Sequence, residues 1–161
     1  MLLNGHDHHS MSRDRHVPFH VASTHAGIEP FLHAGDKAPF VFALLANSVR
    51  AEVEVCLLQF DGNRYDIEAF VLMPNHVHAV IKPTPGSDLS TVLQGIKGVS
   101  ANRCNKLLGH KSTFWMDESY DHMVRDVKEL RAFRNYIAQN PDKAGLRSEE
   151  YSLHLRDVLI T

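Results

Sequence analysis

The chain has 161 residues and a formal net charge of −2, with 43% hydrophobic and 22% charged residues. These values are typical of one globular domain with a proper core. No apolar run could span a bilayer and no signal-peptide pattern opens the chain, so we expect no membrane association and a cytoplasmic location. The slightly acidic balance gives no sign of nucleic-acid binding, which would have to come from a local patch.

The first residues and the two cysteines carry little functional information. Residues 1–16 are rich in histidine but have no periodic apolar pattern, so we expect a disordered tail there and a single domain over residues 17–161. Cys56 and Cys104 lack the CxxC spacing of redox or metal sites. We therefore expect buried free thiols in a reducing compartment.

Hydrophobic periodicity predicts four strands and three helices in the order β-α-β-β-α-β, followed by the last helix. The strands are expected at residues 17–23, 65–72, 77–82 and 119–124, the helices at 37–60, 88–108 and 127–140, and a short amphipathic tail at 147–161. This order is typical of an α+β fold of the ferredoxin-like or RRM-like kind, an antiparallel sheet with helices on one face. The other face would be left open.

The most specific chemistry lies in the central hairpin. Pro74 and Asn75 favour a tight turn, the first by fixing φ and the second by tolerating unusual backbone angles. Alternation along the next strand places His76 and His78 on one face, with Cα atoms about 6.5–7 Å apart, while Val77 points into the core. Such a pair can begin a divalent-metal site, but a bare pair is equally consistent with the wet face of a sheet.

The last helix carries two polar residues on one face. Tyr136 lies beside its apolar stripe, and Asn140 follows four residues later, about one turn along. Pro141 is expected to end the helix. Taken singly, Tyr136 could be an amphipathic core tyrosine and Asn140 a helix-terminating residue.

One stretch is locally basic. Between residues 94 and 113 there are four basic residues and no acidic one. The basic residues are Lys97, Arg103, Lys106 and Lys111. We expect them to form a DNA-contact face of the second helix, although a solvated helix face would have the same composition.

Four segments occur in an order and spacing that resembles a known family. They are AFVLMPNHVHAVIKP, IKGVSANRCN, FW-x4-YDHMVRD and YIAQNPDKAGL, within roughly residues 65–146. Together they are similar to the single-tyrosine transposases of the His-hydrophobic-His class, in particular to the REP-associated tyrosine transposases. The resemblance implies that His76 and His78 are paired metal ligands, Asn140 a third ligand and Tyr136 the nucleophile.

The resemblance further implies a metal-dependent endonuclease and strand transferase acting on single-stranded DNA next to hairpins. Such an enzyme forms a 5′-phosphotyrosine intermediate and leaves a free 3′-hydroxyl. Two imidazoles and an amide suit Mg²⁺ or Mn²⁺ when phosphate and water complete the shell. Some relatives work as homodimers and others as monomers, so a homodimer is an open expectation.

Two alternatives remain at this stage. The chain could be a domesticated, non-catalytic nucleic-acid-binding module that keeps the sheet and the basic helix but not the chemistry. It could also be a His-x-His metallohydrolase with water as its nucleophile. The hydrolase needs a further acidic ligand, which the sequence does not identify.

Overall fold

The computed structural model describes residues 19–26, 47–109, 111 and 113–157. Within this part of the chain, strands and helices alternate much as the periodicity predicts. The strands are β1 (His20–Ala26), β2 (Tyr65–Leu72), β3 (His76–Pro83), β4 (Trp115–Met123) and β5 (Ser152–Leu155). The helices are α1 (Asn47–Leu58), α2 (Leu89–Leu108), α3 (Val127–Lys143) and the short 3-10 helix η2 (Ser148–Glu150).

The strands form one antiparallel sheet in the order β4-β1-β3-β2-β5. Its first four strands have the predicted ferredoxin-like order. The expectation of only a short amphipathic tail over residues 147–161 was wrong, because this segment contains η2 and β5. A four-residue strand is too short to give a clear alternation, and it forms because the open edge of β2 offers unpaired backbone groups.

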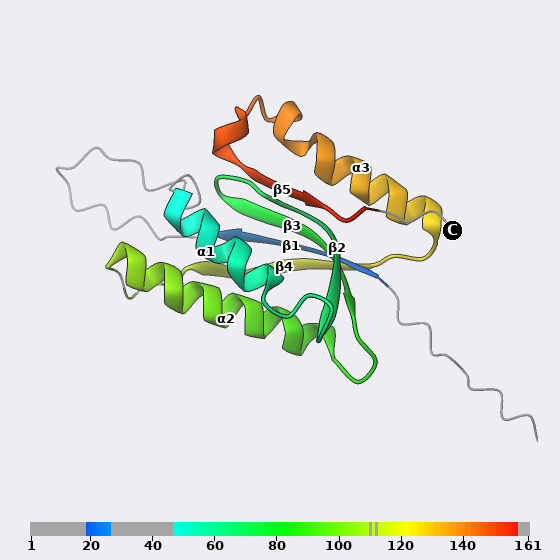
Figure 1. Cartoon of the computed structure of the whole chain (residues 1–161), viewed down its shortest axis with the longest axis horizontal. Coiled ribbons are helices and arrows are strands. Elements are labelled where there is room, and N and C mark those ends of the chain that lie inside the picture. The colour runs from blue at the N-terminus through cyan, green and yellow to red at the C-terminus, as the bar shows by residue number, and fades with distance from the viewer. Residues whose placement is uncertain (1–18, 27–46, 110, 112, 158–161) are drawn as a thin grey trace, which may run out of the picture.

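The sheet lies between two helical layers (Figure 1). Helices α1 and α2 pack together on one face, and α3 packs on the other, chiefly against β2 with further contacts to β3 and β5. Alternation along β3 divides the two sides: Val77 and Ile81 join the α1/α2 core, whereas Val80 joins the smaller core under α3. The face that the first two helices leave open is therefore the face that α3 partly covers.

The α1/α2 side is an apolar core in which Tyr65 and Trp115 are paired, whereas the buried hydroxyl of Thr24 has no partner among the described residues. The hydroxyl of Tyr65 donates to the carbonyl oxygen of Leu57 at 2.8 Å, and the indole N–H of Trp115 donates to Ser100 Oγ at 2.9 Å. Both cysteines are buried free thiols here, as the spacing predicted. Burial raises the pKa of the Cys104 thiol to about 12, so this sulfur stays protonated and unreactive.

Several predicted boundaries differ from the structure. β1 runs three residues later than expected and β4 begins four residues earlier, because pairing between these two strands decides their ends. α1 ends at Leu58, two residues early; residues 37–46, like the tail at 1–16, lie outside the described residues.

Pro141 does not end α3, which continues to Lys143. A proline in the last turn removes only one backbone donor. The carbonyl of Pro141 still accepts from the backbone N–H of Leu146 at 3.0 Å, and Gly145 takes the left-handed conformation (φ 66°) that closes the helix.

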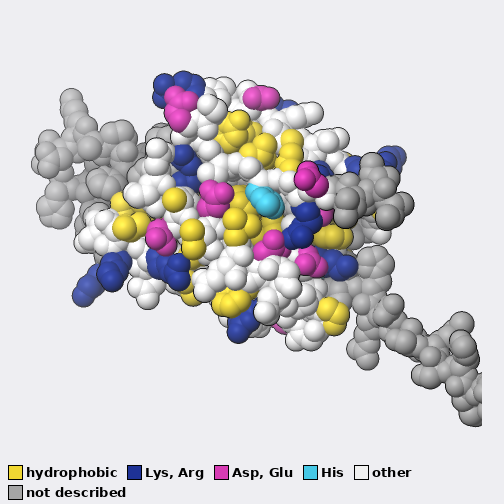
Figure 2. Space-filling view, viewed as in Figure 1, with side chains coloured by type: hydrophobic (Ala, Val, Ile, Leu, Met, Phe, Trp, Pro, Cys, Tyr) yellow, Lys and Arg dark blue, Asp and Glu magenta, His cyan; other side chains and the backbone are white. Residues whose placement is uncertain are grey.

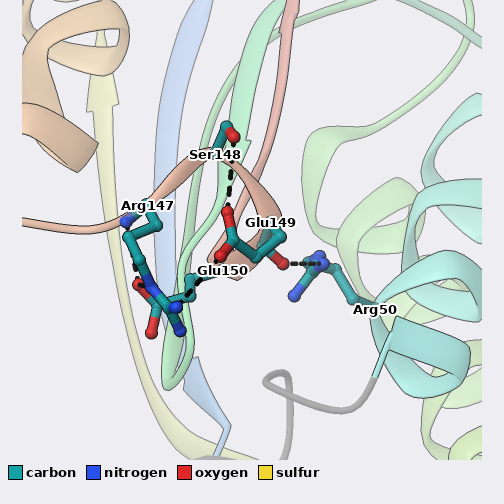
Figure 3. A network of polar contacts seen from close by, with 5 residues as sticks. All are labelled: Arg50, Arg147, Ser148, Glu149 and Glu150. Atoms are coloured by element: carbon teal, nitrogen blue, oxygen red, sulfur yellow. Dashed lines mark hydrogen bonds and ion pairs between the residues drawn. The ribbon is translucent and has the colours of Figure 1, made fainter.

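The segment after α3 is tied back to α1. The guanidinium of Arg50, which is buried, donates from Nη2 to Asn47 Oδ1 and to the carbonyl oxygen of Glu149, both at 2.7 Å. Figure 3 shows this contact beside the ion pairs that Arg147 makes with Glu149 and Glu150. The segment that precedes β5 is thus fixed to α1.

Candidate active site

The histidine pair faces α3. Both imidazoles are partly buried, and their ring centroids lie 4.8 Å apart in an edge-to-face arrangement. The tight turn predicted at Pro74-Asn75 is present, because the backbone N–H of Met73 donates to the carbonyl of His76 at 2.8 Å. The hairpin therefore fixes both rings on one face of the sheet, at the start of β3, directly after the turn from β2.

A hydrogen bond selects the tautomer of His76. Its Nδ1 lies 2.8 Å from Asn75 Oδ1, and with the amide in this orientation its oxygen accepts from a protonated Nδ1. Nε2 is then the nitrogen with the lone pair, which is the form that a metal ligand needs. Sequence reasoning gave Asn75 only a role in the turn; its position directly before the pair was the available signal.

The tyrosine helix brings Tyr136 to the histidine pair within the same chain. The Tyr136 ring meets the His78 ring edge-to-face, with centroids 5.3 Å apart. Tyr136 is 45% exposed, so a large substrate can reach this side chain. Asp126 caps the start of α3 by accepting from the backbone N–H of Glu129 at 2.7 Å.

Asn140 lies one helical turn beyond Tyr136, as predicted. Its Nδ2 is buried and has no hydrogen-bond partner, which costs about 1–3 kcal/mol in an ordinary protein interior. An amide left unsatisfied at such a place is a candidate for a ligand that binds when substrate does. Rotation of the amide by half a turn exchanges its oxygen and nitrogen, so the oxygen can take the buried position.

The donor set of His76, His78 and Asn140 fits an open divalent-metal site. Two neutral imidazoles and one amide oxygen supply three ligands and leave room for phosphate and water. In the described part of the chain, no cluster of three His, Cys, Asp or Glu side chains could hold a metal. The additional acidic ligand that a His-x-His metallohydrolase requires is therefore not found among those residues.

Charged groups around α3 shape the local field. The ammonium of Lys143 lies 5.8 Å from the centre of the Tyr136 ring. Lys143 follows Tyr136 by seven residues, about two helical turns, and so lies on the same flank of α3. Glu129 lies at the other end of this flank. Hydrogen bonds from the backbone N–H of Arg125 and then from His122 hold the pKa of Glu129 below its usual value. Sequence reasoning missed Lys143, although two turns of spacing from Tyr136 could have indicated it.

The opposite flank of α3 is fixed by Arg134, a partly buried arginine that pairs with a buried carboxylate. Arg134 forms an ion pair with Glu68, the bulge residue of β2, and also donates to the Glu68 carbonyl at 3.2 Å. Its Nη2 donates to the carbonyl of Arg156 at 2.9 Å. Arg156 in turn reaches Asp61 Oδ1 at 2.5 Å and the Ile67 carbonyl at 2.7 Å. These contacts fix the tyrosine helix against β2 and the end of β5.

The residues predicted as a DNA-contact face lie on or just after α2, on the side of the sheet opposite to Tyr136. Lys97 donates to the carbonyl of Met116 at 2.9 Å, and Arg103 pairs with Glu52 at 3.6 Å. Lys106 is in the last turn of α2 and Lys111 is exposed beyond it. Their role stays a prediction. Figure 2 shows basic and acidic side chains interspersed over the face in view, with no single basic patch.

A pocket of about 820 Å³ lies beside α2, away from the tyrosine. Its lining includes His20, whose Nδ1 is 3.3 Å from Asp121 Oδ1, and none of His76, His78, Tyr136 and Asn140. The candidate site residues therefore lie outside this pocket.

Comparison with known proteins decides the family. Residues 44–140, more than half of the chain, match the family described as "Transposase IS200 like". This chain belongs to the IS200-like transposase family. The matched residues include the histidine pair, Tyr136 and Asn140, and they begin just before α1.

Two similar proteins are described as REP-associated tyrosine transposases. A curated REP-associated tyrosine transposase of Escherichia coli (strain K12) is 30% identical over 82 residues, which is 50% of this chain and 47% of the relative. The chain thus spans about half the length of that relative. A solved structure of a REP-associated tyrosine transposase bound to a REP hairpin has the same fold, with a TM-score of 0.58 at 17% identity over 89% of this chain and 90% of that one. Among the described residues, no helix is long and apolar enough to cross a membrane.

Proposed function

We propose that this chain cuts and rejoins single-stranded DNA beside hairpins through a covalent bond to Tyr136, with a divalent cation, Mg²⁺ or Mn²⁺, held by His76, His78 and Asn140. The observation that carries the proposal is the edge-to-face contact of Tyr136 with His78 at 5.3 Å between ring centroids, on an exposed flank of α3. A nucleophile and a metal-binding pair are thereby adjacent within one chain. Family membership and the hairpin in the related structure support the choice of substrate.

The reaction exchanges one phosphate ester for another. The phenolic oxygen of Tyr136 forms a bond to phosphorus as the bond from phosphorus to the 3′ oxygen breaks, and the proton lost by the phenol is balanced by one taken up by the 3′ oxygen. When bound, the cation would withdraw charge from the phosphate oxygens and orient the group for in-line attack. The 5′-phosphotyrosine conserves the ester bond, so attack by a 3′-hydroxyl reverses the step and joins DNA.

The side chains around Tyr136 have defined tasks in this scheme. The Asn75 amide keeps His76 in the tautomer with the lone pair on Nε2. Lys143, 5.8 Å from the Tyr136 ring, favours a negative charge developing on the phenol oxygen or on the phosphate. Arg134 and its contacts hold α3 in place, so that the nucleophile does not have to be ordered when DNA binds.

The test is an adduct assay with labelled single-stranded hairpin oligonucleotides, Mg²⁺ or Mn²⁺, and a denaturing gel. We expect label to migrate with the wild-type protein, to disappear with chelator, and to be absent for Tyr136→Phe. The matched control is Tyr151→Phe, a partly buried tyrosine at the edge of the core under α3, which should keep the adduct.

Other outcomes would assign other functions. Cleavage without an adduct would overturn the proposal in favour of a metallohydrolase. Binding of the hairpin with neither cleavage nor adduct, across a panel of loop and flank sequences, would indicate a non-catalytic nucleic-acid-binding module.

A further inference from the structure

Three aromatic rings lie beside the candidate active site, on the same face of the sheet. We call Tyr120, His122 and Phe133 the aromatic ledge. The rings of Tyr120 and His122, two residues apart on β4, are nearly parallel (7°) with centroids 6.2 Å apart. The His122 ring is 5.5 Å from that of Phe133 on α3. Tyr120 is 58% exposed, whereas the other two rings are partly buried, so the ledge has an open end at Tyr120.

The strand register places the open end of the ledge level with the histidine pair. Ser23 of β1 is opposite His78 on one side and opposite Tyr120 on the other. Residues directly opposite each other in an antiparallel sheet share a face, so the side chains of Tyr120 and His78 stand on the same face. They are separated by two strand spacings, about 10 Å.

The inner end of the ledge is fixed. His122 Nε2 is 2.8 Å from Glu129 Oε1, and the second oxygen of Glu129 accepts from the backbone N–H of Arg125 at 2.7 Å. These bonds join β4 to the first turn of α3, the helix that carries Tyr136. The ring against which Tyr120 lies is therefore oriented before any ligand arrives, which lowers the entropy cost of stacking a further ring on Tyr120.

We propose that Tyr120 stacks against a base of the DNA strand that passes the Tyr136 site, within one or two nucleotides of the phosphate that is cut. This inference rests on the proposed function. Exposed aromatic rings bind successive bases of single-stranded nucleic acid with little dependence on sequence. The carboxylate of Glu129 repels phosphate at the inner end of the ledge, so we expect the strand at the open end, where Tyr120 offers a ring to a base.

The first measurement is binding, in a Tyr136→Phe background that cannot react. A fluorescent single-stranded hairpin oligonucleotide with its flanks is titrated with protein while anisotropy is recorded. We expect Tyr120→Ala to weaken binding roughly 10-fold, and Tyr120→Phe or Tyr120→Trp to restore it, because the ring and not the hydroxyl makes the contact. The slope of log affinity against log salt should stay unchanged, since no phosphate contact is lost.

The matched control is Met123→Ala. Met123 lies on the same strand and is 55% exposed, but it pairs with His20 and so stands on the other face. The Met123→Ala variant should bind the oligonucleotide as tightly as the Tyr136→Phe background does. An equal loss for both variants would overturn the inference, since it would indicate a general effect on β4. A loss for Tyr120→Ala that Tyr120→Trp does not restore would overturn it as well.

A second measurement locates the base. An abasic nucleotide is placed in turn at each position flanking the cut. At one position we expect the abasic substrate to weaken binding to the background as much as Tyr120→Ala does, and the two changes together to cost no more than either alone. Strictly additive losses at every position would overturn the assignment.

The outcomes separate the inference from the proposed function. An adduct on the wild-type protein, with unchanged binding for Tyr120→Ala, would overturn only the role of Tyr120. Ring-dependent and base-dependent binding without any adduct would overturn the transferase while leaving Tyr120 as a base-stacking residue.

Discussion

Two tyrosines, one on each face of the sheet, illustrate how differently the faces are built. Tyr65 is 1% exposed in the α1/α2 core, and its hydroxyl donates to the Leu57 carbonyl. Burial raises its pKa to about 12. Tyr136 is 45% exposed and lies against His78. The same side chain is thus a structural hydrogen-bond donor on one face and a candidate nucleophile on the other. Exposure and neighbouring groups decide between these roles, not residue type.

The difference extends to the whole of each face. The α1/α2 side buries a continuous set of aliphatic and aromatic side chains, in which polar groups such as Tyr65 and Trp115 are paired. The α3 side has a smaller core, and beside it lie partly buried imidazoles and the unsatisfied amide of Asn140. The larger apolar core lies on the first face, where Thr24 Oγ1 also lacks a partner among the described residues, and the unsatisfied amide on the second face lies where a ligand is expected to bind.

The largest contrast should come from one histidine on each face. His154 on β5 stacks against Phe70 on the α1/α2 face, with centroids 5.1 Å apart, whereas His78 faces Tyr136. We expect His78→Ala to slow adduct formation by about 100-fold or more, as loss of one group that stabilises transition-state charge does. His154→Ala should leave the rate within a few-fold. Rates at saturating DNA and metal, with circular dichroism as the folding check, test this; equal rates would remove His78 from the site.

A smaller but substantial effect is expected from the buried ion pair behind α3. Arg134→Met leaves the Glu68 carboxylate buried without its partner, which should lower the free energy of unfolding by about 3 kcal/mol. Arg147→Met, which removes exposed ion pairs, should cost no more than about 0.5 kcal/mol.

Denaturant titrations measure both losses. The double variant Arg134→Met, Glu68→Leu should lose less than Arg134→Met alone, because no unpaired charge remains buried. We also expect Arg134→Met to slow adduct formation at temperatures where the variant is still fully folded. The reason is that α3 then holds Tyr136 less firmly. A fully active Arg134→Met protein would show that the anchored flank of α3 does not position the nucleophile.

Alkaline pH should weaken the α1/α2 face through Tyr65. Because its folded-state pKa of about 12 lies above the ordinary value of 10, the unfolded chain loses this proton first. The stabilising contribution is complete below pH 10 and is lost as pH rises towards 12, with a slope of up to about 1.4 kcal/mol per pH unit. Thermal melts between pH 8 and pH 11.5 should fall more steeply for wild type than for Tyr65→Phe. Parallel curves would contradict the burial of this phenol.

The sequence predicted what local pattern determines. Strict alternation after a Pro-Asn turn gave the hairpin and the shared face of the histidines. The four-residue step gave the placement of Asn140 beyond Tyr136. Contacts between distant segments could not be predicted in this way. The ion pair of Arg134 with Glu68 and the register that aligns Ser23 with both His78 and Tyr120 depend on how the sheet assembles.

The strand β5 is a second feature that local sequence pattern could not predict. Its four residues have no distinctive period, and only the open edge of β2 gives them a structure. Helix α3 continues past Pro141 to Lys143, and backbone donors of Ala144, Gly145 and Leu146 satisfy the carbonyls of its last turn, which no pattern within the helix could reveal.

The smallest effect we predict compares the same cap on two helices. Asp88 caps α2 by accepting from the backbone N–H of Thr91 at 3.0 Å, and Asp126 caps α3 in the same way at 2.7 Å. Each change to Ala should cost about 1 kcal/mol, because one backbone donor in the first turn loses its partner. Only Asp126→Ala frays the helix that holds Tyr136, so it alone should slow adduct formation by a few-fold at equal loss of stability. Equal slowing by both variants would mean that activity follows global stability, and the separate roles assigned to the two faces would then be wrong.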